Sequence, residues 1–127
     1  MIKRTIALST VAAIVAVPAV LLIAAPANAD VERHGSCGGG RYELNADREG
    51  RGYEVNVDLE NLTAGSKWRV VIKQDGATKF SAVRTAERDG DIDVERYLSD
   101  TPGKDVIRFT ATRVGTSMSC GAAITFA

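Results

Sequence analysis

The chain has 127 residues, with 16 lysines and arginines balanced by 16 aspartates and glutamates. This balance argues against a nucleic-acid-binding protein, because phosphate recognition requires a strong excess of positive charge. Basic and acidic residues are also interleaved along the chain, which is typical of a mixed soluble surface. At this length we expect one small domain and no second one.

Residues 1–29 have the pattern of a secretory signal peptide. A short basic start precedes a long apolar run, residues 6–25, and the small residues Ala27 and Ala29 form a cleavage site. Cleavage is therefore predicted between Ala29 and Asp30. Because about twenty apolar residues can also span a bilayer, a retained anchor is the alternative. After cleavage we expect a secreted, extracellular protein without membrane contact.

Cys37 and Cys120 are the two cysteines of the chain. An even number of cysteines in an oxidising compartment favours a structural disulfide, and the absence of C-x-x-C spacing argues against a redox pair. The bond would join the start of the first predicted strand to that of the last, and these strands can run side by side in an immunoglobulin-like sandwich. Closing a loop of about 84 residues restricts the unfolded chain by about 4.5 kcal/mol in the chain-entropy relation.

From residue 41 onward, apolar and polar side chains alternate with a period of two, which indicates half-buried antiparallel strands. Asp75-Gly76 is a hairpin signal, and Gly50 and Gly52 are expected to take positive φ in the loop after the first strand. Residues 30–40, with three consecutive glycines, are predicted to be a flexible lead-in. Seven strands are expected, over residues 41–47, 53–59, 67–74, 77–84, 91–98, 106–114 and 119–126.

These strands predict an all-β fold, a seven-stranded antiparallel immunoglobulin-like β-sandwich over residues 41–127. Trp68 on the third strand, the Asp-Gly and Pro-Gly turns, and a cysteine near each end of the mature part resemble small secreted immunoglobulin-fold proteins of actinomycete-type bacteria. Such proteins mostly have no assigned activity. Trp68 resembles the core tryptophan of immunoglobulin domains, but Cys37 and Cys120 do not lie on the second and sixth strands, which the antibody-type bridge joins. Antibody-like recognition is therefore not carried over.

No catalytic residue, cofactor site or metal site is expected. His34, the single histidine, lies in the predicted lead-in, where little would hold it in place. Asp89, Asp91 and Asp93 superficially suggest a calcium loop. Alternation instead places Asp91, Asp93 and Glu95 on the solvated face of a strand, and Val94 stands where that loop requires glycine, so a weak cation site is the alternative.

The expected function is that of a non-catalytic binding or structural module of the cell envelope or extracellular space. Its partner would be an unknown protein or envelope component. A small-molecule carrier or hydrolase inhibitor is the alternative, because secreted actinomycete sandwiches of this size resemble such proteins. Function is expected in the loops 48–52, 60–66 and 99–105 or on a sheet face. Val71 and Phe80 are expected to form a small exposed apolar patch or to pack at a sheet edge.

Overall fold

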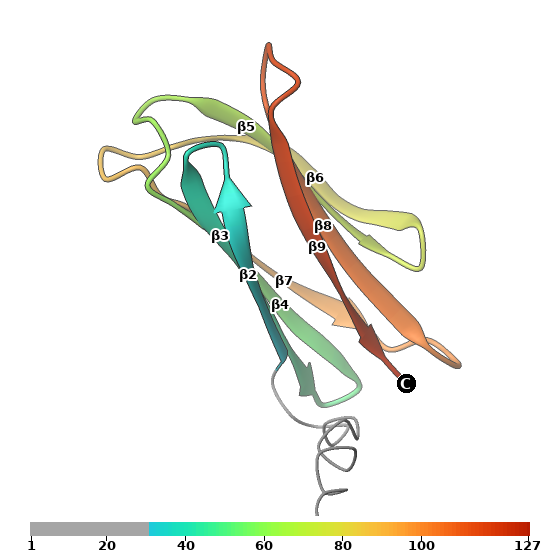
Figure 1. Cartoon of the computed structure of the whole chain (residues 1–127). Helices are drawn as coiled ribbons and strands as arrows, with labels where there is room; N and C mark the ends of the chain where they lie inside the picture. Colours follow the sequence, from blue (N-terminus) through green and yellow to red (C-terminus); the bar gives the residue numbers. More distant parts are fainter. Residues whose placement is uncertain (1–30) are drawn as a thin grey trace, which may run out of the picture.

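The computed structural model describes residues 31–127, which form eight strands in two antiparallel sheets (Figure 1). The first sheet has the strand order β2-β3-β4-β7, and the second sheet has the order β6-β5-β8-β9. The predicted signal peptide and its cleavage site lie outside the described residues. The strands are β2 (Val31–Cys37), β3 (Gly40–Glu49), β4 (Gly52–Glu60), β5 (Lys67–Gln74), β6 (Ala77–Thr85), β7 (Ile92–Ser99), β8 (Asp105–Arg113) and β9 (Ser119–Phe126).

Each sheet buries one face against the other, as the alternation of side chains predicts. In β4 the inward positions from Tyr53 to Leu59 are at most 1% exposed, and in β8 the inward residues Ile107, Phe109 and Ala111 are fully buried. The intervening residues of β4 are half-buried and polar. Burial of one large apolar side chain contributes about 1.5–3 kcal/mol, so this shared core is the main source of stability.

Residues 31–37 form β2, so the prediction of a flexible lead-in is wrong for this segment. This strand pairs with β3 from Val31 opposite Ala46 to Cys37 opposite Gly40. Gly38 and Gly39 are the two turn residues, with φ of 52° and 87°. Two consecutive positive φ angles are what a tight hairpin needs. The glycine run is therefore a hairpin turn, and the structure has eight strands rather than the seven expected.

The order of the strands differs from that of constant-type immunoglobulin domains. There the fourth of seven strands belongs to the sheet of the first, second and fifth. Here the fourth predicted strand, β6, pairs with β5 in the second sheet. Asp75 and Gly76 explain the difference, because both have positive φ, at 51° and 86°. Their two-residue turn places β6 directly beside β5.

The hairpin between β3 and β4 uses its two glycines differently. Gly50 has a φ of 57°, as predicted, but Gly52 has no positive φ and is the first residue of β4. A Cβ atom on Gly52 would lie 2.1 Å from the carbonyl oxygen of Leu98. Gly52 is therefore required for the close approach of β4 and β7, which corrects the expectation for this residue.

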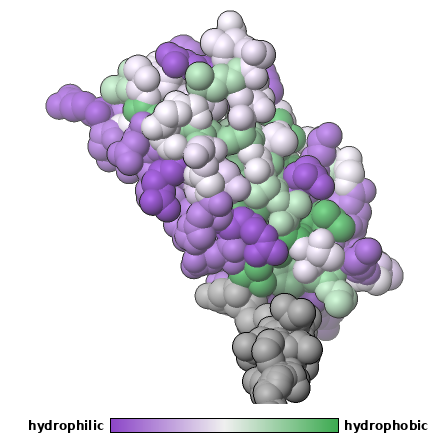
Figure 2. Space-filling model, viewed as in Figure 1, coloured by the Kyte–Doolittle hydropathy of each residue, from purple (hydrophilic) through white to green (hydrophobic). Residues whose placement is uncertain are grey.

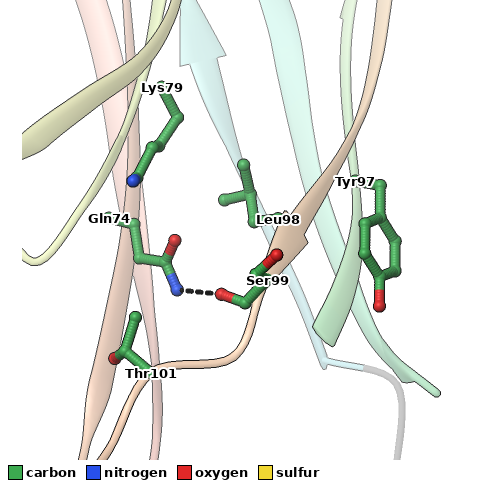
Figure 3. Close-up of a pocket in the computed structure, with 6 residues that line it drawn as sticks. All are labelled: Gln74, Lys79, Tyr97, Leu98, Ser99 and Thr101. Atoms are coloured by element: carbon green, nitrogen blue, oxygen red, sulfur yellow. Dashed lines mark hydrogen bonds between the residues drawn. The ribbon is translucent and has the colours of Figure 1, made fainter. Parts of the chain in front are cut away.

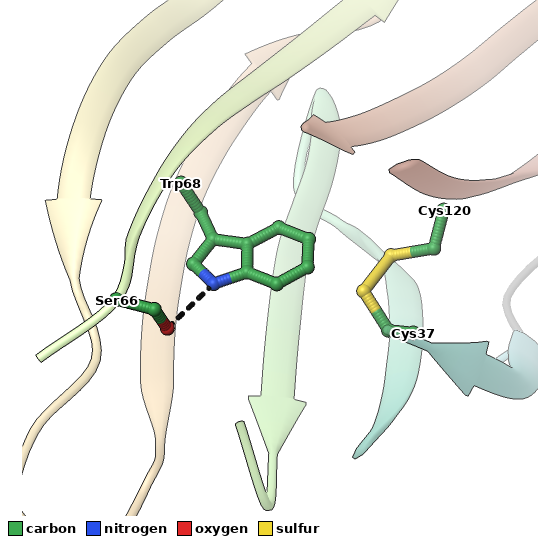
Figure 4. Close-up of a disulfide and its surroundings, with 4 residues drawn as sticks. All are labelled: Cys37, Ser66, Trp68 and Cys120. Atoms are coloured by element: carbon green, nitrogen blue, oxygen red, sulfur yellow. Dashed lines mark hydrogen bonds between the residues drawn. A yellow bond between two sulfur atoms is a disulfide. The ribbon is translucent and has the colours of Figure 1, made fainter. Parts of the chain in front are cut away.

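The predicted disulfide between Cys37 and Cys120 is present, with a Cα–Cα distance of 5.1 Å (Figure 4). It joins the end of β2 to the start of β9. These strands are edges of different sheets and lie side by side along one side of the sandwich. The bond therefore connects the two sheets, rather than neighbours in one sheet. Trp68 lies in the core near this bond, 1% exposed, and its indole nitrogen donates to Ser66 Oγ at 2.9 Å.

For Phe80 the alternative of packing at a sheet edge is confirmed, and the exposed patch with Val71 is not formed. Phe80 is 9% exposed and belongs to the core at the open side between β6 and β7. The guanidinium groups of Arg84 and Arg96 lie over its ring, 5.5 and 4.7 Å from the centroid. The arginines shield this ring from solvent while their charged groups stay hydrated.

Candidate functional site

The outer face of the first sheet is acidic. Its four strands place carboxylates in neighbouring rows, with Glu43 opposite Asp58 and Asp58 opposite Asp93. The outward positions of these strands also include one arginine, Arg41, and one histidine, His34. We call this surface the acidic face. Its nine carboxylates are Glu32, Glu43, Asp47, Glu49, Glu54, Asp58, Glu60, Asp93 and Glu95.

Asp58 lies at the centre of the acidic face and has a strongly perturbed pKa. Partial burial, hydrogen bonding to Asp93 and the charges of Asp93, Glu43 and Glu60 together raise the pKa of its carboxyl to about 7. Carboxylates in direct contact resist simultaneous ionisation. A proton on Asp58 removes one of these adjacent negative charges, so its raised pKa reflects the density of carboxylates on this face.

Glu32, His34 and Glu43 form a mixed imidazole and carboxylate group at the β2 edge of the acidic face. Their ligand atoms all lie within 4.8 Å of one another. His34 Nε2 is 3.2 Å from Glu32 Oε1, and Asn45 donates to Glu32 Oε2 at 3.0 Å. His34 is thus held on a strand, which corrects the expectation that it lies in a flexible segment. This donor set is of a kind that binds zinc.

A second group of possible cation ligands consists of carboxylates alone, from Asp47, Glu49 and Glu54. The residues of the suggested calcium loop, Asp89, Asp91 and Asp93, are not among the clusters that the structure forms within residues 31–127. Asp89 instead accepts a hydrogen bond from the backbone nitrogen of Asp91 in the turn before β7.

The outer face of the second sheet is basic. Its charged outward side chains are Lys67, Arg69 and Lys73 on β5 and Arg108 on β8, with Lys73 directly opposite Arg108. No carboxylate occupies an outward position in the four strands of this sheet. We call this surface the basic face. Apart from these four cations, its side chains are mostly small and uncharged, as in β9. The long lysine and arginine side chains therefore have short neighbours.

The two sheets therefore have opposite charge although the chain as a whole is balanced. The strands of the first sheet contain nine acidic and four basic residues, a net charge of −5. Those of the second sheet contain seven basic residues and one acidic residue, a net charge of +6. Figure 2 shows hydrophilic residues over β2 and β3 and a more apolar strip between the two sheets. This separation could not be predicted from the sequence, because it becomes visible only when the strands are assigned to sheets.

A buried polar network holds the sheets together at the end opposite the disulfide. Asp105 is fully buried, accepts a hydrogen bond from the Tyr53 hydroxyl at 2.7 Å and from Gln74 Nε2 at 3.1 Å, and also accepts one from Thr101 Oγ1. Although burial alone would raise the pKa of Asp105, these donors hold it well below its usual range. The pKa of Tyr53 is raised, first by desolvation and then by its hydrogen bond to Asp105. The network is therefore a structural anchor with an ionised carboxylate.

A small open depression lies beside this network (Figure 3). It has a volume of about 270 Å³, and Gln74 donates to the Ser99 carbonyl at its base, at 2.8 Å. Sites for small molecules are usually larger, enclosed and mostly apolar. The depression therefore gives little support to the carrier alternative. It is lined by Gln74, Lys79, Tyr97, Leu98, Ser99 and Thr101.

Two of the three loops predicted to carry function lie together. Loops 48–52 and 99–105 meet where Asp100 pairs with Arg48 at 3.1 Å and the backbone nitrogen of Asp100 donates to the Arg51 carbonyl at 2.9 Å. Loop 60–66 lies at the other end of the molecule, where the backbone nitrogen of Leu62 donates to the Gly90 carbonyl. The three loops therefore do not form one common surface (Figure 1).

No protein-family model, curated protein or solved structure matches this chain. The disulfide indicates an oxidising location outside the cytoplasm. Within residues 31–127, no helix has the length and apolar character needed to cross a membrane.

Proposed function

We propose that the chain is an exported, non-catalytic immunoglobulin-like module that binds charged partners through the outer faces of its two sheets. In this proposal residues 1–29 direct secretion, and the mature domain acts in the cell envelope or the extracellular space. The observation that carries the proposal is the separation of charge between the acidic face and the basic face.

Three features of the described residues support binding rather than catalysis. Both cysteines are in a disulfide, so neither is available as a nucleophile. His34 is paired with the carboxylate of Glu32 on the acidic face and lies opposite Glu43, rather than beside a paired nucleophile. The other strongly perturbed carboxyl, Asp105, is sealed in the core by its hydrogen bonds. A general acid or base must instead be within hydrogen-bonding distance of a substrate.

Binding through the sheet faces is favoured over binding through the loops. Each face has one predominant sign of charge, and clusters of one sign steer and select partners of the opposite sign. The loops do not form one surface, and the depression near loop 99–105 is small. Rigid strands also hold charged side chains at fixed spacing, so that binding requires little ordering of the protein.

The proposal is tested by zero-length cross-linking of amines to carboxylates on intact producing cells, followed by mass spectrometry. We expect saturable cross-links from Lys67 and Lys73 of the basic face or from the carboxylates of the acidic face. Lys104, which lies in the turn before β8, is the internal control and should give fewer cross-links. Cross-links that are absent from both faces, or no more frequent than those of Lys104, would contradict the proposal.

A further inference from the structure

We propose that the partner of the acidic face is the basic face of a second copy of this chain. This inference rests on the proposed function and deepens it, because it assigns the chemistry of the partner. The two faces lie on opposite outer surfaces of one sandwich, so every molecule carries both halves of the contact. Opposite charge on two surfaces of similar extent favours their association.

The spacing of the charges supports this pairing. Side chains on one face of a strand recur at about 6.6 Å along the strand, and neighbouring strands are about 4.8 Å apart. Lys67, Arg69 and Lys73 follow this repeat along β5. Glu54, Asp58 and Glu60 follow the same repeat along β4, the third strand of the acidic face. The charges of one face can therefore align with those of the other over several rows.

Most charges on the two faces lack a compensating ion pair within the molecule. Among residues 31–127, Lys67, Arg69, Lys73 and Arg108 take part in none of the ion pairs, and Arg69 donates only to the hydroxyl of Ser81. On the acidic face, Glu32 and Glu60 take part in ion pairs, and Asp47 also has a partner. Pairing with a second copy would relieve repulsion on both surfaces, at Lys73 opposite Arg108 and at Asp58 opposite Asp93.

The geometry also predicts the kind of assembly. The contact uses different surfaces on the two molecules and is therefore heterologous, and such contacts extend in an open chain unless a rotation closes them. The two faces point in opposite directions, which favours an open stack along the normal to the sheets. One face measures about 19 by 26 Å, or roughly 500 Å² in projection. This is less than the roughly 800 Å² per partner of stable complexes, so the association should be weak and sensitive to salt.

The inference is tested by analytical ultracentrifugation of the exported protein with its disulfide intact. At about 20 mM salt, charges interact over roughly 20 Å, and at about 0.3 M salt over roughly 6 Å. We expect the average mass to increase with concentration at the lower salt and the dissociation constant to rise at least tenfold at the higher salt.

Two variants distinguish this contact from other modes of association. One removes the charge of the basic face with Lys67→Gln, Arg69→Gln, Lys73→Gln and Arg108→Gln. The other removes six charges of the acidic face, with Glu43→Gln, Glu54→Gln, Asp58→Asn, Glu60→Gln, Asp93→Asn and Glu95→Gln. The matched control removes charges in turns, with Arg51→Gln, Arg88→Gln and Lys104→Gln. Near-ultraviolet circular dichroism establishes that each variant is folded.

Each face variant alone should remain monomeric, whereas the control should associate like the parent protein. An equimolar mixture of the two face variants should form dimers and nothing larger, because only one complementary pair of faces remains. A parent protein that is monomeric at about 20 mM salt, or a mixture that does not pair, would overturn the inference. If cell-surface cross-links to another molecule persist in that case, the proposed function stands. If the purified protein stacks but cells give neither cross-links to another molecule nor cross-links between copies of this chain, only the proposed function is contradicted.

Discussion

Asp58 shows how one side chain reports the charge of a whole face. Its carboxyl is half-buried and in contact with Asp93, and its pKa is raised to about 7 from an ordinary value of 3.8. The folded protein thus holds the proton more tightly than the unfolded chain does. For a carboxyl with a raised pKa, stability is greatest below the unfolded value and falls as the pH rises toward the folded value.

Asp58→Asn should therefore stabilise the protein in a pH-dependent manner. The gain should be near zero at about pH 4 and reach roughly 1 kcal/mol above about pH 7, in the range for like charges directly opposite each other in a sheet. Urea unfolding at both pH values measures this difference. Glu87→Gln, in the exposed turn before β7, is the control and should change stability by less than about 0.5 kcal/mol. An equal gain at both pH values would contradict the assignment.

Tyr53→Phe tests the buried network at the opposite end from the disulfide. The Tyr53 hydroxyl donates to Asp105 and lies 3.1 Å from both Asp100 and Arg48. Removing it leaves a buried carboxylate with one donor fewer, which should cost about 1.5–3 kcal/mol in urea unfolding. Tyr97→Phe is the control, because that hydroxyl bonds an exposed carbonyl, and it should cost under about 0.5 kcal/mol. Similar losses in the two variants would show that the network is not an anchor.

At the scale of the strands, the period-two alternation was sufficient to predict seven elements with bounds within one or two residues. β2 was missed because Glu32, Arg33 and His34 are all exposed on an edge strand and give no alternating apolar signal. The glycine pair of its turn, Gly38 and Gly39, is the sequence feature that indicates this strand. The network around Asp105 could not be predicted either, because Tyr53 and Asp105 are far apart in sequence and meet only through the packing of the sheets.

The bond between β2 and β9 should be the largest single covalent contribution to stability. Replacing both cysteines, with Cys37→Ala and Cys120→Ala, should lower the free energy of unfolding by about 4.5 kcal/mol, as expected for a loop closed over 83 residues of sequence. Urea unfolding with and without reductant measures the effect. The parent protein should lose stability on reduction, whereas the double variant should not respond. A change under about 1 kcal/mol would show that packing alone joins the two edges.

At the scale of the whole molecule, overall charge is a poor guide to behaviour. The acidic and basic residues are interleaved in the sequence, and the composition therefore predicted a mixed surface. The order of strands in the sheets then gathers one sign on each side, from −5 in the first sheet to +6 in the second. The strands could be predicted from alternation, but the candidate site required the topology.

This distribution predicts unusual chromatography for a nearly neutral protein. At neutral pH and about 20 mM salt, the protein should bind both an anion-exchange and a cation-exchange resin, because each resin meets one face within the range of unscreened charge. The variant without charge on the basic face should lose retention on the cation exchanger alone. The turn variant should keep both. Retention of the parent protein on neither resin would show that the two faces do not act as separate charged surfaces.

The bond between Cys37 and Cys120 also encloses almost all of the described chain within one covalent ring. A protease outside the cell that cuts an exposed connection, such as residues 48–52 or 99–105, would open this ring without releasing a fragment. The two pieces would stay joined through sulfur, and their strands could remain paired. Damage that would destroy an unbridged domain would thus leave a nicked molecule that still presents both charged surfaces.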